Sequence, residues 1–546
     1  MTSYGLLQFI PLAVIVLLIG WIASRVPERR LERLRGLPDS PLAPALAAAV
    51  MMAVIWYLWG SLRQVPVIHD EASYLLQAET FAKGRWAMPR PPIPAFFEQI
   101  HVLVTPTYAS KYWPGHGILL VPGIWLGAPG LVPLLLNGAA AALLFVLVRK
   151  VANGWVAALT LVLWIPLHST MLFRPSYFSE NTSSALWLLG WLAVLQWRES
   201  GGERWLVVLA GCVGWMAITR PLTAVAFAIP IAVVVLRDVA RGRTWRSLVR
   251  PALLALAIVA VIPVWSANTT GSWRTTPYSA YTNQYLPFDR MGFGADQSPP
   301  DHVLPTDMAH LAQSFKTMHE GYTPRRLPRA FFDRWHVMFG DAYHGLQKGL
   351  APFVIVALIV LPAAGWFAVA SSLLLTAAYL SYAHPPAWSL YYLEITPLLP
   401  FLTAFGIWAV WIRLIAWRKA ARRITPPNPA AHAALAGLLL FLFLALPARV
   451  AILHMQREHI VRRQYQSDFT TDVSHLPGRR TLVFIRYGEN HFYNRSLIAN
   501  EADLPDARTW LVYDRGEENR ALLQLAPDRT PYLYDDSTST FYRLVR

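Results

Sequence analysis

Three consecutive polar residues, His69-Asp70-Glu71, follow closely after an apolar segment that runs from about residue 41 to residue 60. A positioned carboxylate can take a proton from a hydroxyl group, and two adjacent carboxylates can instead hold a divalent cation. The segment Lys111-Tyr-Trp-Pro-Gly-His116 comes after a long polar stretch, and its lysine could bind a phosphate group. Together these residues predict an active site that takes its substrate from a lipid bilayer.

The elements that must position these residues are apolar and arranged in blocks. Of the 546 residues, 55% are hydrophobic and only 15% are charged. The hydrocarbon core of a bilayer is roughly 30 Å thick and needs about 20 apolar residues per helix. We therefore predict an α-helical protein that crosses the membrane about 12 to 13 times. The predicted blocks are 6–23, 41–60, 129–148, 156–172, 183–197, 204–219, 222–236, 251–266, 351–366, 367–383, 395–415 and 433–452, and residues 116–127 form either a re-entrant hairpin or part of a thirteenth span.

The distribution of positive charge predicts which loops face the cytoplasm. The net charge is +16, and much of the excess lies in four short segments, 25–35, 149–150, 237–250 and 413–423. Cytoplasmic loops retain lysine and arginine during membrane insertion. The larger loops 61–115 and 267–350, with residues 453–546, are then expected on the outer face. This distribution argues against nucleic acid as the partner of the basic chain.

The outer segments contain patterns of their own. Ala72, Leu75, Leu76 and Phe81 recur at near-helical spacing, which predicts a short helix on the membrane surface. The segment 453–546 predicts a linker helix, then strands at 481–486, 509–513, 531–534 and 540–545 and a helix at 519–525. We therefore divide the chain into a membrane domain, 1–452, which includes outer loops 61–115 and 267–350, and a small outer α/β domain, 453–546.

Each candidate residue also has a purely structural explanation. Asp70 and Glu71 could cap the surface helix, where acidic side chains interact favourably with free backbone amides. Lys111 could extend its ammonium group from the membrane interface into water. Arg174 and Arg220 each precede a proline, so turn geometry and lipid headgroups could account for both.

Several short motifs occur in one order along this topology. The acidic pair is followed by Tyr74, by Gly84-Arg85-Trp86 and by Lys111-Tyr-Trp-Pro114. In these features the chain resembles the GT-C superfamily of integral-membrane glycosyltransferases. It is most similar to the bacterial branch related to protein mannosyltransferases and the lipid A aminoarabinose transferase. The resemblance covers roughly residues 41–420. Relatives often have an arginine before a tyrosine and a Leu-Pro run, whereas this chain has Ser389-Leu-Tyr-Tyr-Leu-Glu394.

This resemblance implies a sugar donor carried on a polyprenyl phosphate. The sugar would pass to an acceptor hydroxyl on the outer face, usually with inversion at the sugar carbon. The resemblance assigns catalysis to Asp70, with Glu71 in the same motif, and a first-loop carboxylate would act as the base. The frequent use of Arg, Ala, Leu and Trp is typical of a GC-rich bacterium, so we expect the protein in the plasma (inner) membrane.

The remaining candidates would bind the donor phosphate or the acceptor. The leaving lipid phosphate needs charge stabilisation more than a proton. The resemblance assigns this role to Lys111, and Arg174 and Arg220 could share it. The residues expected to orient the acceptor or a cation are Glu180, His69 and His116.

The sequence leaves open the sugar, the acceptor and the need for a metal. The acceptor could be a lipid, a glycan or a protein, and a divalent cation such as Mg²⁺ or Mn²⁺ could take part. Two other functions are a transporter or flippase of a lipid-linked sugar and a non-catalytic partner in envelope polysaccharide assembly. Transporters often have internal repeats and charged residues near the membrane midplane, and the apolar blocks here have neither feature. We expect the C-terminal domain to help bind the acceptor or to stabilise the outer face.

Overall fold

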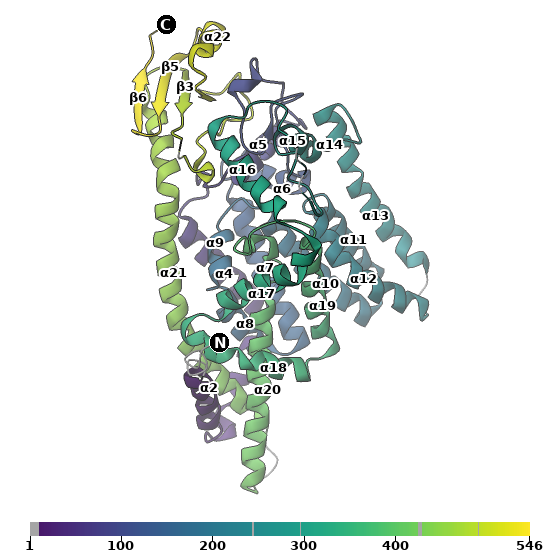
Figure 1. Ribbon diagram of the computed structural model, residues 1–546. Helices are drawn as coiled ribbons and strands as arrows, with labels where there is room; N and C mark the ends of the chain where they lie inside the picture. The colour runs from purple at the N-terminus through teal and green to yellow at the C-terminus, as the bar shows by residue number, and fades with distance from the viewer. Residues whose placement is uncertain are drawn as a thin grey trace.

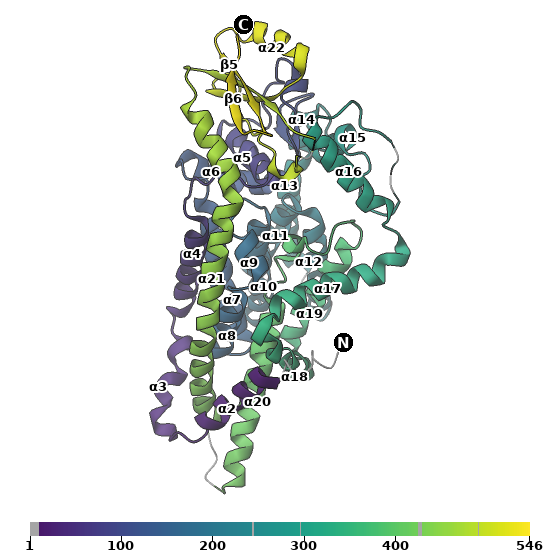
Figure 2. The same ribbon diagram turned by 60° about the vertical axis from the view of Figure 1, so that its left-hand side comes forward.

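A helical bundle carries a small β-sheet domain at one end (Figure 1). The computed structural model describes residues 10–242, 245–294, 296, 298–423, 428–489 and 491–545. Residues 25–40 and the arginine-rich end of the helix Leu398–Ala421 lie at the end opposite the sheet (Figure 2). The sheet and the helices of residues 69–82, 277–285 and 306–320 lie together at one end of the bundle, whereas residues 345–350 of the predicted outer loop 267–350 pack against the helix 10–23.

The helices and strands have the following bounds. The α-helices are α2 Ile10–Ala23, α3 Glu32–Arg35, α4 Ala43–Trp59, α5 His69–Ala82, α6 Pro114–Trp125, α7 Leu131–Val151, α8 Gly154–Trp164, α9 His168–Phe173, α10 Glu180–Ser200, α11 Glu203–Ala217, α12 Pro221–Ala240, α13 Val249–Val259, α14 Val261–Thr270, α15 Pro277–Tyr285, α16 Thr306–Glu320, α17 Leu327–Ala342, α18 Pro352–Val360, α19 Ala363–Tyr379, α20 Leu398–Ala421, α21 Pro429–His475 and α22 Asn519–Leu525. The 3₁₀ helices are η1 Glu28–Arg30, η2 Leu37–Asp39, η3 Pro94–Phe96, η4 Trp245–Leu248, η5 Pro324–Arg326, η6 Gly345–Leu350, η7 Ser389–Tyr392, η8 Tyr493–Arg495 and η9 Gly516–Glu518. The strands are β1 Val102–Leu103, β2 Ala109–Ser110, β3 Thr481–Arg486, β4 Thr509–Tyr513, β5 Thr530–Asp535 and β6 Thr540–Arg543.

Every predicted apolar block coincides with helix in the described part of the chain, although residues 6–9 of the first block lie outside it. The block 156–172 is divided between α8 and α9, with Pro166 between them. By length and composition, the described residues contain five helices that could cross a membrane, or up to seven if each of two bent pairs counts as one span. The prediction of 12 to 13 membrane crossings was based on the number of apolar blocks. Several of these blocks form helices that are shorter than a full span, such as α8, with 11 residues.

Close packing holds the bundle together. The indole of Trp411 in α20 is fully buried and donates a hydrogen bond to the carbonyl oxygen of Val16 in α2, at 3.0 Å. Helices α18 and α20 approach closely at Gly406, where a β-carbon would stand 1.9 Å from the carbonyl oxygen of Phe353. Glycine at this position therefore permits backbone contact that a larger residue would prevent.

The predicted surface helix is α5, and it packs against α6. Helix α6 has 12 residues, and Gly127 with a φ of 60° follows it before α7 begins. A left-handed turn of this kind favours glycine. The stretch 116–127 is thus a short helix and its turn rather than a full span.

The C-terminal sheet has the strand order β4-β3-β5-β6. Strand β3 is parallel to both neighbours, with Val483 opposite Leu511 on one side and Tyr532 on the other, whereas β6 is antiparallel to β5. Helix α22 connects β4 to β5. All four predicted strands and the predicted helix of this segment are present.

Helix α21 joins the two parts of the molecule. It runs for 47 residues without interruption, so the predicted domain boundary at residue 452 falls inside a helix. Figure 2 shows it rising along the bundle to the sheet. The sheet domain also contacts α16 and the end of α5. Tyr513 donates a hydrogen bond to Asp307 of α16 at 2.6 Å, and Lys83 at the end of α5 pairs with Asp503 at 2.8 Å.

Candidate active site

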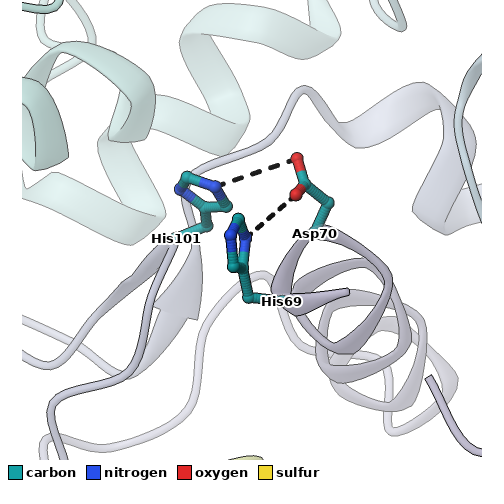
Figure 3. A group of neighbouring side chains, drawn as sticks. All are labelled: His69, Asp70 and His101. Atoms are coloured by element: carbon teal, nitrogen blue, oxygen red, sulfur yellow. Dashed lines mark ion pairs between the residues drawn. The ribbon is translucent and has the colours of Figure 1, made fainter. Parts of the chain in front are cut away.

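Asp70 lies in the first turn of α5, and two histidine side chains point toward its carboxylate (Figure 3). The distance from His69 Nδ1 to Asp70 Oδ2 is 2.9 Å, and His101 Nε2 lies 3.8 Å from Asp70 Oδ1. The hydroxyl of Tyr112 donates a hydrogen bond to Asp70 Oδ1. Segments that are distant in sequence thus converge on one carboxylate.

His101 is held in place by its backbone, which lies just before β1. Its φ of 66° places it in the left-handed region, which a residue with a β-carbon adopts only when its surroundings enforce it. Its N–H donates to the Tyr281 hydroxyl at 2.9 Å, and its carbonyl oxygen accepts bonds from the Ser73 hydroxyl at 2.8 Å and the Lys111 N–H at 3.0 Å. These bonds aim the imidazole at Asp70.

The surroundings of Asp70 keep its side chain ionised. Burial alone would raise its pKa, but the neighbouring His101 and His69, together with hydrogen bonds from His69 and Tyr112, hold the pKa well below its usual range. The pKa of His101 is lowered as well, by burial and then by the charge of Lys111. Burial thus favours the uncharged form of the His101 imidazole, while the hydrogen bonds from His69 and Tyr112 favour the Asp70 carboxylate anion.

A cavity of about 280 Å³ opens in front of Asp70. We call it the Asp70 cavity. Its polar lining includes Asp70, His69, Lys111 and Asp289, and part of its aromatic lining comes from Tyr278, Tyr382, Trp388 and Tyr391. Apolar side chains from α9 and the loop after it, Leu172, Phe173 and Phe178, line another part. A space with charged, aromatic and apolar walls suits a ligand that carries a polar group on a hydrocarbon chain.

Lys111 supplies positive charge to this cavity while remaining only 3% exposed. Its ammonium group lies 4.9 to 5.4 Å from the ring centres of Tyr281, Tyr278 and Tyr112. Among the residues that the structure describes, no carboxylate forms an ion pair with it. Burial lowers its pKa, although the charges of Asp289 and Asp70 oppose this effect. A buried ammonium group in this position is suited to an anionic ligand.

Glu71 faces away from the cavity. Its two carboxylate oxygens accept hydrogen bonds from the backbone N–H groups of Val67, at 3.3 Å, and Tyr177, at 3.0 Å. Burial raises its pKa to about 7, although these backbone bonds oppose the shift. Its contacts tie the start of α5 to the loop that precedes α10. The predicted catalytic role of Glu71 would therefore require a change in this arrangement.

The predicted residues Glu180 and Arg220 pair with each other in the bundle rather than lining the Asp70 cavity. Arg220 also lies 3.6 Å from Glu394 and donates a hydrogen bond to the Tyr379 hydroxyl at 2.6 Å. All three charged side chains are almost fully buried. The donors of Arg220 are thus engaged with protein groups.

Arg174 and His116 are also occupied by protein partners. Arg174 is 1% exposed and donates hydrogen bonds to Asn137 Oδ1 at 3.2 Å and to the Leu393 carbonyl oxygen at 3.1 Å. His116 lies between the Thr182 hydroxyl and the Tyr177 carbonyl oxygen, each at 2.8 Å. Neither residue lines the Asp70 cavity. Of the predicted site residues, the cavity brings together Asp70, His69 and Lys111.

The residues around Asp70 could hold a metal ion. One ligand atom each from His69, Asp70 and His101 lies within 4.8 Å of the others. Two imidazoles and one carboxylate suit Mn²⁺ or Zn²⁺ better than Mg²⁺, which prefers oxygen ligands. An ionised Asp70 and a neutral His101 are in the protonation states that metal binding needs.

Several residues of the site were not singled out by the sequence. His101, Asp289, Tyr493 and Asn494 come from three segments far apart in the chain, and of these four only Asn494 belongs to a short motif, the triplet Asn494-Arg-Ser496, which chance explains. Asp289 accepts a hydrogen bond from the Tyr382 hydroxyl at 2.9 Å and lies 3.3 Å from His319 Nε2. Only the position of each residue in the polar outer loops could have suggested it.

Comparison with known proteins identifies the fold. No family model matches the chain, and no curated protein matches it. Among solved structures, it is similar to ArnT from Cupriavidus metallidurans bound to undecaprenyl phosphate, with a TM-score of 0.55 at 12% identity, over 93% of this chain and 97% of ArnT. ArnT in the apo state gives a TM-score of 0.50 at 12% identity, over 89% and 88% of the two chains.

The chain has the GT-C fold. The expected resemblance is therefore confirmed at the level of architecture, including the membrane helices and the small C-terminal domain. The segment that contains Asp70 and the segment that contains Asp289 meet over the end of the bundle.

Proposed function

We propose that the protein is a membrane glycosyltransferase that moves a hexosyl or pentosyl group from a polyprenyl phosphate to an acceptor hydroxyl. The observation that carries the proposal is that Lys111 and Asp70 line the same cavity. A buried ammonium group without a carboxylate partner faces the same space as an ionised carboxylate. The GT-C fold supports it, since ArnT with this fold is bound to undecaprenyl phosphate.

The transfer step assigns a separate role to each group. The acceptor oxygen attacks the anomeric carbon, and the bond between that carbon and the phosphate oxygen breaks. Asp70 receives the hydroxyl proton as the new bond forms and the attacking oxygen becomes more acidic. The electron pair of the broken bond stays on the polyprenyl phosphate, whose negative charge Lys111 stabilises. Attack on the face opposite the phosphate inverts the anomeric carbon.

Neighbouring residues position these groups. His69 and Tyr112 fix the orientation of the Asp70 carboxylate through the contacts described above. Glu71 holds the start of α5 against the Tyr177 backbone. The buried ion pairs of Arg220 with Glu180 and Glu394 act without contacting the substrate, because they fix the helices that surround the cavity. A divalent cation bound at His69, Asp70 and His101 would supply further charge stabilisation.

The expected location is the plasma membrane of a bacterium, with the sheet domain on the outer face. The support is the arginine content of the connections at the opposite end of the bundle. A polyprenyl-phosphate donor and a lipid, glycan or protein acceptor would then meet outside the cytoplasm.

The test is sugar transfer in proteoliposomes with a panel of polyprenyl-phosphate sugars and bacterial membrane extract as the source of acceptor. Asp70→Asn should lower donor consumption by about 100- to 10,000-fold, the usual contribution of a general base. Asp333→Asn is the matched control, because this exposed acid on α17 lies outside the Asp70 cavity. No consumption of any donor by folded wild-type protein, or equal rates for both variants, would refute the proposal.

A further inference from the structure

A second cavity, of about 380 Å³, also borders His69. We call it the α5–α21 cavity. It is bounded by α5, by the outer part of α21 and by residues 496–501 of the C-terminal domain. His69 and Ile68 line both this cavity and the Asp70 cavity. The imidazole that contacts Asp70 therefore separates two spaces.

One loop of the C-terminal domain takes part in both spaces. Tyr493 and Asn494 line the Asp70 cavity, and Asn494 Oδ1 lies 3.1 Å from His69 Nε2. A few residues later, Leu497, Ile498 and Ala499 line the α5–α21 cavity. The His69–Asn494 contact is thus the point at which the C-terminal domain, the carboxylate site and the second cavity meet.

The charges of the two cavities differ. Lys111 and Arg462 line the Asp70 cavity. In the part of the chain that the structure describes, no lysine or arginine lines the α5–α21 cavity, which instead contains Glu79 and Glu501. A phosphate group can pair with Lys111 or Arg462 in the first cavity, which Asp70 and Asp289 also line, whereas the charged groups of the second are both carboxylates. The walls of the second are mostly apolar, with Leu75, Phe469 and Val473 among them.

One buried polar atom in the second cavity points to the kind of ligand. Gln466 lines the cavity and is 8% exposed. Its Nε2 donates to the Val67 carbonyl oxygen at 3.0 Å, which fixes the orientation of the amide. Its Oε1 has no hydrogen-bond partner among the described residues. A buried carbonyl oxygen without a partner costs free energy, and a ligand hydroxyl would satisfy it.

We propose that the α5–α21 cavity binds the acceptor, and that the acceptor is an uncharged amphiphile that carries hydroxyl groups, such as a neutral glycolipid. This proposal rests on the proposed function. The apolar part of the acceptor lies against α21, and one of its hydroxyl groups donates a hydrogen bond to Gln466 Oε1. The reacting hydroxyl of the acceptor reaches Asp70 past the His69 ring. The donor phosphate and the acceptor thus approach the carboxylate from opposite sides of one imidazole.

The chain offers a matched pair of variants on α21. Thr470 and Thr471 are both exposed, and each hydroxyl donates to the carbonyl oxygen four residues earlier at 2.7 Å. Thr470 lines the cavity and Thr471 does not. Thr470→Trp should fill the cavity and lower kcat/KM for the acceptor at least 10-fold, with undecaprenyl phosphate binding unchanged. Thr471→Trp should behave as wild type. Equal acceptor kinetics for the two variants would overturn the proposal.

A second pair of variants approaches the cavity from the C-terminal domain. Ala499 is exposed at its edge, and Ala521 is exposed on α22 away from it. Ala499→Trp should also lower kcat/KM for the acceptor, and Ala521→Trp should leave it unchanged. The test therefore does not depend on the folding of one variant.

A binding measurement separates this proposal from the transfer reaction. The probe is an alkyl glycoside with a photoreactive diazirine in its chain, compared with the corresponding alkyl phosphate. The glycoside should label residues 465–473 or 496–501, and Thr470→Trp should reduce that label at least 5-fold. Labelling elsewhere, or stronger labelling of these segments by the alkyl phosphate, would overturn the site. Labelling as expected without Asp70-dependent donor consumption would support the binding site and refute only the proposed transfer.

Discussion

Replacing Lys111 with methionine separates a ligand-binding lysine from a structural one. Methionine has a similar length and no charge, so it fills the same space beside Tyr281 and Tyr278. If Lys111 binds the donor phosphate, the variant should lose affinity for undecaprenyl phosphate. If Lys111 only stabilises the fold, the variant should instead unfold at a lower temperature and bind as wild type.

The structure provides the expected size of each effect. A hydrogen bond to a charged group contributes about 1.5 to 3 kcal/mol, so Kd should rise by about 10- to 150-fold. Three tyrosine rings near the ammonium group contribute about 0.5 to 1 kcal/mol each. Removing a charge that is 3% exposed and lacks a carboxylate partner relieves a penalty of several kcal/mol. We therefore expect the midpoint of thermal unfolding to stay constant or rise.

The assay is binding of undecaprenyl phosphate to purified protein in detergent, with thermal unfolding recorded on the same samples. Lys83→Met is the control, because Lys83 is 45% exposed and pairs with Asp503 outside the cavity. That exposed pair should contribute at most about 1 kcal/mol to stability and nothing to binding. An unchanged Kd for Lys111→Met would refute the assignment of Lys111 to the donor phosphate.

Three further results are expected. The raised pKa of Glu71, about 7 in the folded state, means that its contribution to stability is full below about pH 4.5 and is lost as the pH rises through 7. The free energy of unfolding should fall by about 3 kcal/mol over this range. Glu71→Gln should flatten the dependence of the thermal midpoint on pH between 5 and 8, and an unchanged slope would contradict this reasoning. Glu180→Gln leaves Arg220 with one fewer carboxylate partner and should lower the free energy of unfolding by about 3 to 5 kcal/mol. The control Glu199→Gln breaks an exposed pair with Lys150 and should lower it by at most about 1 kcal/mol. Transfer should persist after treatment with EDTA, because His69 and Tyr112 already hold the Asp70 carboxylate; activity lost with EDTA and restored by Mn²⁺ or Zn²⁺ would assign His69, Asp70 and His101 to a metal site.

Apolar periodicity and charge were enough to predict much of the fold. Blocks of apolar residues became helices because buried or membrane-facing backbone must satisfy its own hydrogen bonds. The strands at 481–486 and 509–513 match β3 and β4 residue for residue, since alternating and branched side chains with polar turns favour a sheet. The number of membrane crossings was less well defined, because a block such as 156–172 breaks into two short helices at Pro166.

The acidic pair shows the limit of prediction from a local motif. Asp70 and Glu71 were predicted to work together, yet consecutive residues of an α-helix point about 100° apart. In α5, Asp70 therefore faces the cavity while Glu71 faces the backbone of Tyr177. Arg220 and Glu180 were predicted to bind the donor phosphate and to orient the acceptor or a cation, and in the structure they pair with each other, because buried charges need partners and these two residues meet inside the bundle.

The sequence by itself determined the helices, the C-terminal sheet and the placement of Asp70 and Lys111 in one polar segment between two apolar blocks. These features depend on local pattern, so neighbouring residues are sufficient to specify them. Only the tertiary structure decided which side chains surround Asp70. His101 lies beside Asp70, Asp289 lines the same cavity and Asn494 contacts His69, and packing of separate segments against the sheet domain brings these residues together. Contacts of this kind depend on how whole elements fit against one another, and no local spacing records that fit.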